Sequence, residues 1–169
     1  MSGTGLDCNR DWTQVITDFN IARPPLTGQA RTGITLNDHH SRRTNAVLKV
    51  LASATLSDTD YKELKERKIW FIAPPRGVSG WNGRIRQGHE QIIYLSPELE
   101  ADSKADNDCG YSSREVTQIV AHELMHALLG HTDNAPNSAD ERAAWDKVVE
   151  LGFCTRQEAD AWLIRTGIV

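Results

Sequence analysis

The chain has 169 residues, about the size of one folded domain. Hydrophobic residues make up 39% and charged residues 25%, proportions that exclude disorder of the whole chain, and no apolar stretch approaches the roughly 20 residues that cross a bilayer. The 19 Lys and Arg are outnumbered by 23 Asp and Glu, and the net charge of −4 argues against a dedicated nucleic-acid-binding protein.

Residues 1–40 are expected to be mostly loop, with one short helix. The start of the chain lacks a basic stretch followed by an apolar one, so we expect no signal peptide. That expectation places the protein in the cytoplasm or on an export route that needs no such signal. A helix is expected within 11–21, where one face collects the apolar side chains of Trp12, Val15, Ile16 and Phe19.

Residues 41–95 predict two helices followed by two strands. Ser41 can cap a helix through about Ala54, and Ser57 can cap a second, highly charged helix over 58–68. Two apolar, β-rich runs follow and could pair with each other across a long, glycine-rich connection. These runs are 69–72 and 91–95.

The last third of the chain predicts three helices, each opened by a capping box in which Ser or Thr is followed three residues later by Glu. The boxes begin at Ser112, Ser138 and Thr155, and the first helix is expected over about 113–129. Together these elements predict a compact α+β domain with a small central sheet and a helical C-terminal third.

The three cysteines are Cys8, Cys109 and Cys154, which stand too far apart for a zinc ribbon. An odd number allows at most one internal disulfide. Three buried free thiols are the simpler interpretation, and one disulfide with one free thiol is the alternative.

The sequence His122-Glu-Leu-Met-His126 is an HExxH motif within the helix expected at 113–129. Residues four apart share one face of a helix, so both imidazoles can reach one zinc ion. Glu123 is turned about 100° away, beside the metal, where its carboxylate can take a proton from a zinc-bound water and pass it to the leaving amine. The alternative is a pair of histidines one turn apart that bind no metal.

The segment 120–131, which contains this motif, resembles the active-site helix of the zincin metallopeptidases. The resemblance implies a zinc-dependent endopeptidase with one Zn²⁺ per chain, bound by His122 and His126, and with Glu123 as general base. In that family the substrate lies in extended form along an edge strand upstream of the helix. The candidate for that strand here is 91–95.

A catalytic zinc needs a third protein ligand, and the resemblance offers two patterns. The metzincins place Gly three residues and His six residues after the second motif histidine, where this chain has Leu129 and Thr132. The gluzincins take a Glu from the following helix, and Glu141 fits that place. We therefore expect a gluzincin-type set made of His122, His126 and Glu141.

Other assignments of the third ligand stay open. Glu141 is the fourth residue of a capping box, so its carboxylate can instead accept a hydrogen bond from the Ser138 amide. His131 follows Gly130, which is expected to end the helix and turn His131 off the face that carries His126. The remaining candidates are the nearby acidic residues Asp133, Asp140 and Asp146.

Residues outside the motif are expected to have supporting or ordinary roles. Tyr111 and Arg142 are candidates for stabilising the oxyanion, and nothing local selects between them. Trp145 and Trp162 are expected in the core. Three histidines are expected on the surface, namely His39, His40 and His89.

These features predict a zinc endopeptidase with a protein or peptide substrate and no nucleic-acid partner. Small HExxH domains without a signal peptide resemble the toxin or effector peptidases delivered by bacterial secretion machines. One alternative is a zinc amidase that acts on cell-wall peptides. The other is a non-catalytic binding module with a structural zinc, which predicts a closed four-ligand site made of His122, His126, His131 and Glu141.

Overall fold

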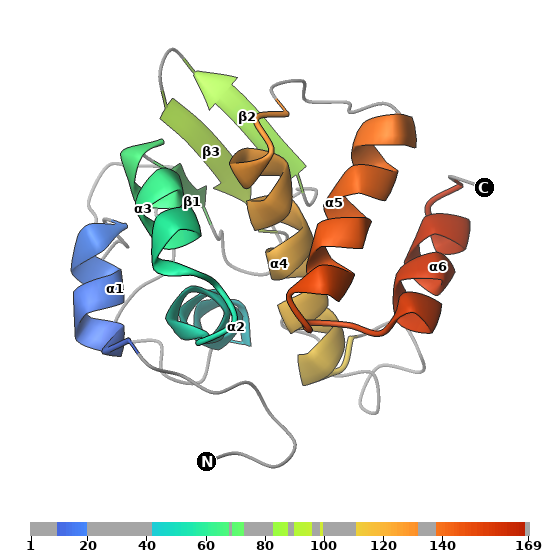
Figure 1. Cartoon of the computed structure of the whole chain (residues 1–169), viewed down its shortest axis with the longest axis horizontal. Coiled ribbons are helices and arrows are strands. Elements are labelled where there is room, and N and C mark those ends of the chain that lie inside the picture. Colours follow the sequence, from blue (N-terminus) through green and yellow to red (C-terminus); the bar gives the residue numbers. More distant parts are fainter. Residues whose placement is uncertain are drawn as a thin grey trace.

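A computed structural model describes residues 10–19, 42–67, 69–72, 83–87, 90–95, 99, 111–131 and 138–167. The helices within these residues are α1 (Trp12–Asp18), α2 (Arg42–Ala52), α3 (Asp58–Glu66), α4 (Ser113–Leu128), α5 (Ser138–Glu150) and α6 (Arg156–Arg165) (Figure 1). The strands are β1 (Ile69–Ile72), β2 (Gly83–Gln87) and β3 (Glu90–Tyr94). None of the described helices is long and apolar enough to cross a membrane.

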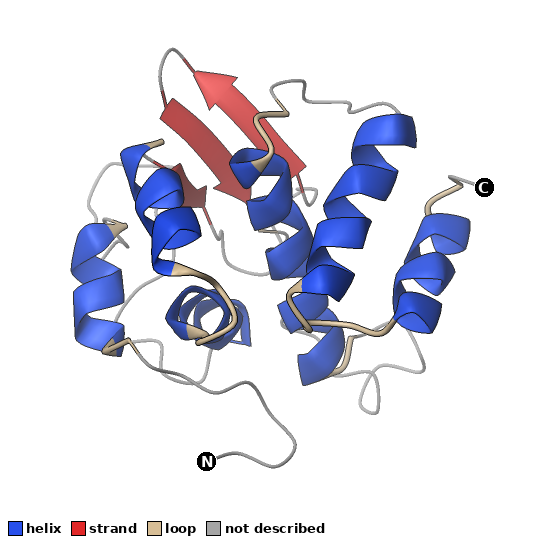
Figure 2. Cartoon of the chain, in the orientation of Figure 1, coloured by secondary structure: helices blue, strands red, loops and turns tan. Residues whose placement is uncertain are grey.

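The prediction of an α+β domain with a central sheet is wrong, because the described part of the chain is mostly helical (73%). The three short strands lie to one side of the helices (Figure 2). Helix α4 packs against α2 and α5, and most of the buried apolar side chains come from helices. Strands of four or five residues offer too little surface for the helices to pack on, so helix-on-helix contacts build the core.

The prediction of an edge strand at about 91–95 is also wrong, because β3 is the middle strand of the order β1-β3-β2. β1 pairs with β3 in parallel, with Ile69 opposite Gln91, so the expected pairing of these two runs is confirmed. β2 pairs with the other side of β3 in antiparallel register, with Ile85 opposite Ile92. The glycine-rich stretch that we expected to be only a connection therefore contains β2, which pairs with the second edge of β3.

The predicted helix starts are confirmed at three caps. The side chain of Ser57 accepts the backbone N–H that opens α3. Ser112 and Glu115 form a reciprocal capping box at α4, with distances of 3.1 and 2.8 Å, and Thr155 and Glu158 form another at α6. Capping depends on residues within one turn, which explains why the sequence alone predicts these starts well.

Helix α4 is surrounded by the rest of the protein, and every side chain on it from Val116 to Ala127 is buried. This buried stretch includes three ionisable residues, with 8% of His122, 7% of Glu123 and 1% of His126 exposed. Burying a charged or polar group without a partner is costly, so such residues must contact one another or a ligand. The HExxH motif is thus both part of the core and the main candidate for a functional site.

The C-terminal end of α4 is a Schellman motif, in which the chain reverses over the last turn of the helix. Gly130 has a φ of 78°, and its N–H donates to the carbonyl of Ala127 at 3.2 Å. The N–H of His131 then donates to the carbonyl of His126 at 3.0 Å. The motif therefore brings His131 back over His126.

Gly130→Ala is expected to lower the free energy of unfolding by about 1 kcal/mol, because an L-residue in the left-handed region costs roughly 1–2 kcal/mol. A Cβ atom at this position meets only the end of the Arg67 side chain, at 4.0 Å, so the loss comes from the backbone. Urea denaturation measures the difference. Gly130→Asn is the matched control, because Asn adopts this conformation more readily, and an alanine variant as stable as wild type would contradict the expected strain.

Candidate metal centre

Three side chains from two helices meet at the middle of α4. The Nε2 atoms of His122 and His126 are 3.1 Å apart. The Glu141 carboxylate reaches both, with Oε1 at 2.8 Å from His126 Nε2 and Oε2 at 3.2 Å from His122 Nε2. One ligand atom from each residue lies within 4.8 Å of the others, so the structure brings together the three residues expected to bind metal.

The packing of α5 against α4 explains how Glu141 reaches the histidine pair. Helix α5 lies beside α4, and Glu141 stands in its first turn (Figure 1). One turn later, Trp145 stacks on the ring of His122 with 4.4 Å between ring centroids and 10° between planes. These two neighbouring contacts from α5 fix its register along α4. The Glu141 carboxylate therefore faces the histidines, not the amide of its own helix start that a capping box would use.

The donor atoms of this group fit a divalent cation. Two imidazole nitrogens that face each other at 3.1 Å need a proton or a cation between their lone pairs. Imidazole nitrogens and a carboxylate oxygen are the donors that zinc takes in catalytic sites with two His and one Glu. The side chains of His122 and His126 are 10% and 2% exposed, and that of Glu141 is 15% exposed, so the group is nearly closed to solvent. The residues present therefore suit zinc.

The charges around His122 also fit a cation at this place. Burial by itself lowers the pKa of His122, but hydrogen bonds to Glu123 and Glu141 outweigh burial and raise that pKa from 6.5 to about 9. Burial by itself raises the pKa of Glu141, but contacts with His122 and His126 hold it well below its usual range. In the metal-free protein a proton on His122 therefore balances the carboxylates at neutral pH, and a bound cation would replace that proton.

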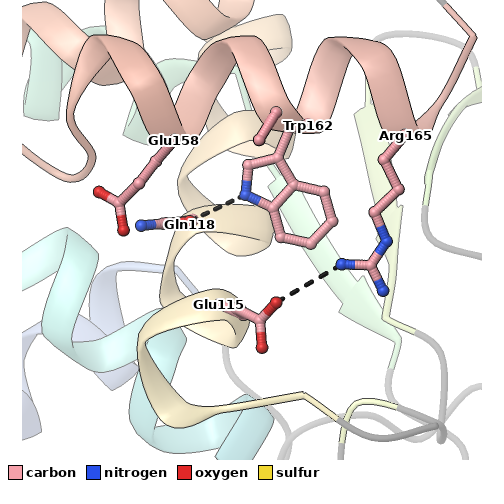
Figure 3. Close-up of a pocket in the computed structure, with 6 residues that line it drawn as sticks. Glu115, Gln118, Glu158, Trp162 and Arg165 are labelled. Carbon is pink, nitrogen blue, oxygen red and sulfur yellow. Dashed lines mark hydrogen bonds and ion pairs between the residues drawn. The ribbon is translucent and has the colours of Figure 1, made fainter. Parts of the chain in front are cut away.

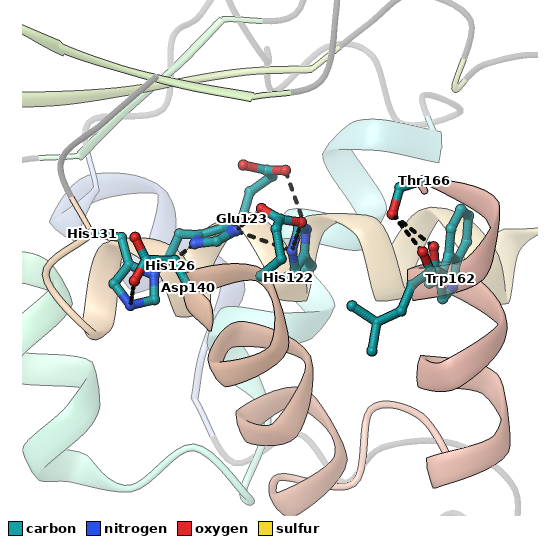
Figure 4. A network of polar contacts seen from close by, with 9 residues as sticks. His122, Glu123, His126, His131, Asp140, Trp162 and Thr166 are labelled. Carbon is teal, nitrogen blue, oxygen red and sulfur yellow. Dashed lines mark hydrogen bonds and ion pairs between the residues drawn. The ribbon is translucent and has the colours of Figure 1, made fainter. Parts of the chain in front are cut away.

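Glu123 lies beside this group and is not part of it. Its Oε2 atom is 3.3 Å from Nδ1 of His122 (Figure 4). The other ring nitrogen of His122, Nε2, is the one that contacts Glu141. A carboxylate in that place can accept the Nδ1 proton and fix the ring of His122 with Nε2 turned toward the group. The group of side chains that could hold a metal therefore contains His122, His126 and Glu141 and does not include Glu123.

His131 contacts His126 from the side opposite the group. The Nδ1 atoms of His126 and His131 are 2.8 Å apart, and Nε2 of His131 lies 3.4 Å from Asp140 Oδ1 (Figure 4). The expectation that Gly130 turns His131 off the motif face agrees with this position. Sequence reasoning missed the return of His131 to the back of His126, although the glycine that ends α4 was the available signal.

The other candidates of the sequence analysis are not brought to the group by any contact of the described residues. Asp146 pairs with Arg156 and is 63% exposed. The ring of Tyr111 lies 5.5 Å from the guanidinium of Arg165, near the start of α4, and Arg142 is exposed on α5. Residues outside the described part of the chain are Cys8, His39, His40, His89, Cys109 and Asp133.

The stacked rings of His122, Trp145 and Trp162 extend from the candidate metal group to α6. Trp145 lies between His122 and Trp162, and its centroid is 5.7 Å from that of Trp162 with 8° between planes. Both tryptophans are buried, as predicted. Arg165 covers the far face of Trp162, with 4.8 Å from its guanidinium carbon to the ring. The sequence analysis placed these tryptophans in the core and missed the contact with a motif histidine.

A small pocket of about 150 Å³ lies at the α6 end of these stacked rings (Figure 3). Its polar walls are only partly paired: the indole N–H of Trp162 donates to Gln118 Oε1 at 2.8 Å, and Glu115 lies 3.5 Å from Arg165, but the buried Nε2 of Gln118 has no hydrogen-bond partner among the residues that the structure describes. Trp145 and Trp162 stand between the pocket and His122. The pocket is therefore separate from the metal group.

The one cysteine among the described residues, Cys154, is free and buried. Burial, together with the nearby charge of Glu158, raises the pKa of its thiol to about 11. A thiol with such a pKa stays protonated at neutral pH, so Cys154 is suited neither to metal binding nor to nucleophilic chemistry.

Comparison with family models, with curated proteins and with solved structures finds no match to this chain. The functional argument therefore depends on the chemistry of the group itself. That chemistry is two imidazole nitrogens and one carboxylate at one point, with a second carboxylate beside them.

Proposed function

We propose that the protein is a zinc-dependent endopeptidase whose metal is bound by His122, His126 and Glu141. The observation that carries the proposal is the convergence of these three side chains from α4 and α5, with their ligand atoms within 4.8 Å of one another. The spacing of the motif alone does not require Glu141 to reach the histidines. Its carboxylate lies 2.8 Å from His126, which supports a shared ligand role.

The number of donors favours a catalytic site over a structural one. Structural zinc sites have four protein ligands, whereas catalytic sites have three and keep one position open. Among the described residues, the fourth ligand that the closed arrangement names is His131. His131 lies on the side of the His126 ring opposite the candidate metal group, where its Nδ1 atom is hydrogen-bonded to Nδ1 of His126. This position argues against the closed arrangement.

In this proposal Glu123 is the residue that moves protons. Bound zinc supplies Lewis acidity and lowers the pKa of a coordinated water to about 7. The Glu123 carboxylate stands beside the group, with Oε2 turned toward Nδ1 of His122. In this proposal the carboxylate accepts a proton from the attacking water and later gives it to the leaving amine. Burial of Glu123 excludes bulk water from this transfer.

Glu141→Gln tests the third ligand and with it the proposal. The change keeps the shape of the side chain but replaces an anionic oxygen by a neutral amide. We expect the wild-type chain to bind one zinc ion with sub-micromolar affinity, and the variant to bind it at least tenfold more weakly, on the order of 1.4 kcal/mol. Competition with a coloured chelator measures both affinities, and hydrolysis of fluorescein-labelled casein measures activity.

Glu150→Gln is the matched control, because it removes one negative charge from the same helix at an exposed position. It should bind zinc and hydrolyse casein as the wild type does. Unchanged zinc affinity in Glu141→Gln would remove Glu141 from the site. A wild-type chain that binds no zinc, or that binds it without hydrolysing any peptide bond, would refute the proposed endopeptidase.

A further inference from the structure

His126 is contacted at both of its ring nitrogens, and the two contacts differ in kind. Nε2 faces His122 and Glu141 in the candidate metal group. Nδ1 faces Nδ1 of His131 at 2.8 Å, and His131 in turn presents Nε2 to Asp140 Oδ1 at 3.4 Å. The contacts at the two ring nitrogens therefore form two separate sets. Figure 4 shows His131 and Asp140 on the side of His126 away from His122.

The backbone holds His131 and Asp140 in these places. The Schellman motif at the end of α4 fixes His131 through its N–H, which donates to the carbonyl of His126 at 3.0 Å. Asp140 stands in the first turn of α5, directly before Glu141. The side chains of His131 and Asp140 are 13% and 29% exposed, so both lie mostly inside the contact between the two helices.

A metal bound at Nε2 of His126 fixes the direction of the hydrogen bonds that link His126, His131 and Asp140. The Nε2 lone pair is then used by the metal, so the ring proton of His126 is on Nδ1 and donates to His131. His131 accepts at its Nδ1, which leaves its own proton on Nε2, facing Asp140. Each nitrogen is thus a donor or an acceptor in agreement with its partner.

We infer that His131 and Asp140 are positioning residues that hold His126 in the ring orientation and tautomer in which it binds the metal. The inference rests on the proposed function, because it concerns the ligand role of His126. A histidine ligand commonly donates its second N–H to a carboxylate or carbonyl, and such a partner strengthens metal binding. In this protein a second histidine lies between the ligand and the carboxylate, and the same contact ties the end of α4 to the start of α5.

Two substitutions of His131 test the inference. His131→Leu keeps the bulk of the side chain and removes both hydrogen bonds. His131→Gln restores them in the same direction, because its amide oxygen accepts and its amide N–H donates. We expect zinc affinity, measured by competition with a chelator, to fall about 10–100-fold in the leucine variant and to stay within about threefold of wild type in the glutamine variant.

Asp140→Ala tests whether Asp140 acts on His126 through His131. It should lower zinc affinity in the same direction, and the double variant with His131→Leu should bind zinc no more weakly than His131→Leu alone, since Asp140 acts through His131. Equal affinity in the leucine, glutamine and wild-type proteins would show that His131 only fills space and would overturn the inference. Loss of zinc in both His131 variants would make His131 a ligand and would overturn it as well.

A measurement without metal separates this inference from the proposed function. An N–H···N hydrogen bond between two imidazoles gives a scalar coupling between their nitrogens, which NMR detects in the metal-free wild-type protein whichever ring is the donor. Presence of the coupling between the two Nδ1 atoms supports the inference, and its absence overturns it even if zinc binds. A wild-type chain that shows the coupling but binds no zinc overturns the proposed function and the ligand role of His126 with it.

Discussion

Glu123→Gln is expected to leave zinc bound while the rate of casein hydrolysis falls by about 10²–10⁴-fold, the usual effect of losing a general base. The amide of Gln cannot take a proton. Its oxygen can still accept the hydrogen bond from Nδ1 of His122, now 3.3 Å from Glu123 Oε2, so the orientation of that ligand should persist. Zinc content and hydrolysis should be measured on the same sample.

Glu115→Gln serves as the control for Glu123→Gln. It removes a carboxylate from the same helix, and Gln also fits the capping box in which Glu115 takes part. Hydrolysis should stay close to wild type. If Glu123→Gln instead loses its zinc, Glu123 is a ligand and its role as proton carrier is wrong.

His126→Ala is expected to abolish zinc binding. His126 is the central residue of the proposed site, because its Nε2 atom lies 3.1 Å from that of His122 and 2.8 Å from Glu141 Oε1, and it is 1% exposed. The loss of affinity should exceed the roughly 10–100-fold that removal of a partner behind a ligand costs. Elemental analysis of the purified proteins measures the zinc content, and circular dichroism checks that the helices remain.

Asp146→Ala is the matched control for His126→Ala. Asp146 was a candidate ligand in the sequence, but its side chain is exposed and pairs with Arg156. This variant should keep one zinc per chain. Equal zinc content in wild type and His126→Ala would mean that zinc binds elsewhere.

Features that depend on a few neighbouring residues could be predicted from the sequence. The capping box of Ser112 and Glu115 and the apolar spacing after it gave α4 almost to the residue. The HExxH spacing predicted two histidines on one face, and the structure has their Nε2 atoms 3.1 Å apart.

Features that depend on contacts between distant segments could not be predicted in the same way. Gly83–Gln87 reads as a connection because the stretch around it is rich in glycine, although Arg84, Ile85 and Arg86 alternate as a strand does, and it pairs with β3. The sheet contributes less of the core than the sequence suggests, because a strand-like run does not indicate how much of the core that strand will build. The stacking of Trp145 on His122 depends on how α5 docks against α4, which no local pattern specifies.

Zinc bound at the proposed site would link metal supply to folding, because the HExxH motif is buried within α4. A ligand that binds only the folded chain adds to its free energy of unfolding, by about 2.7 kcal/mol when the free ligand is at 100 times its Kd. The unfolded chain does not hold His122, His126 and Glu141 together, so a zinc ion bound there acts in this way. The folded fraction of the protein would then rise and fall with the free zinc of its surroundings.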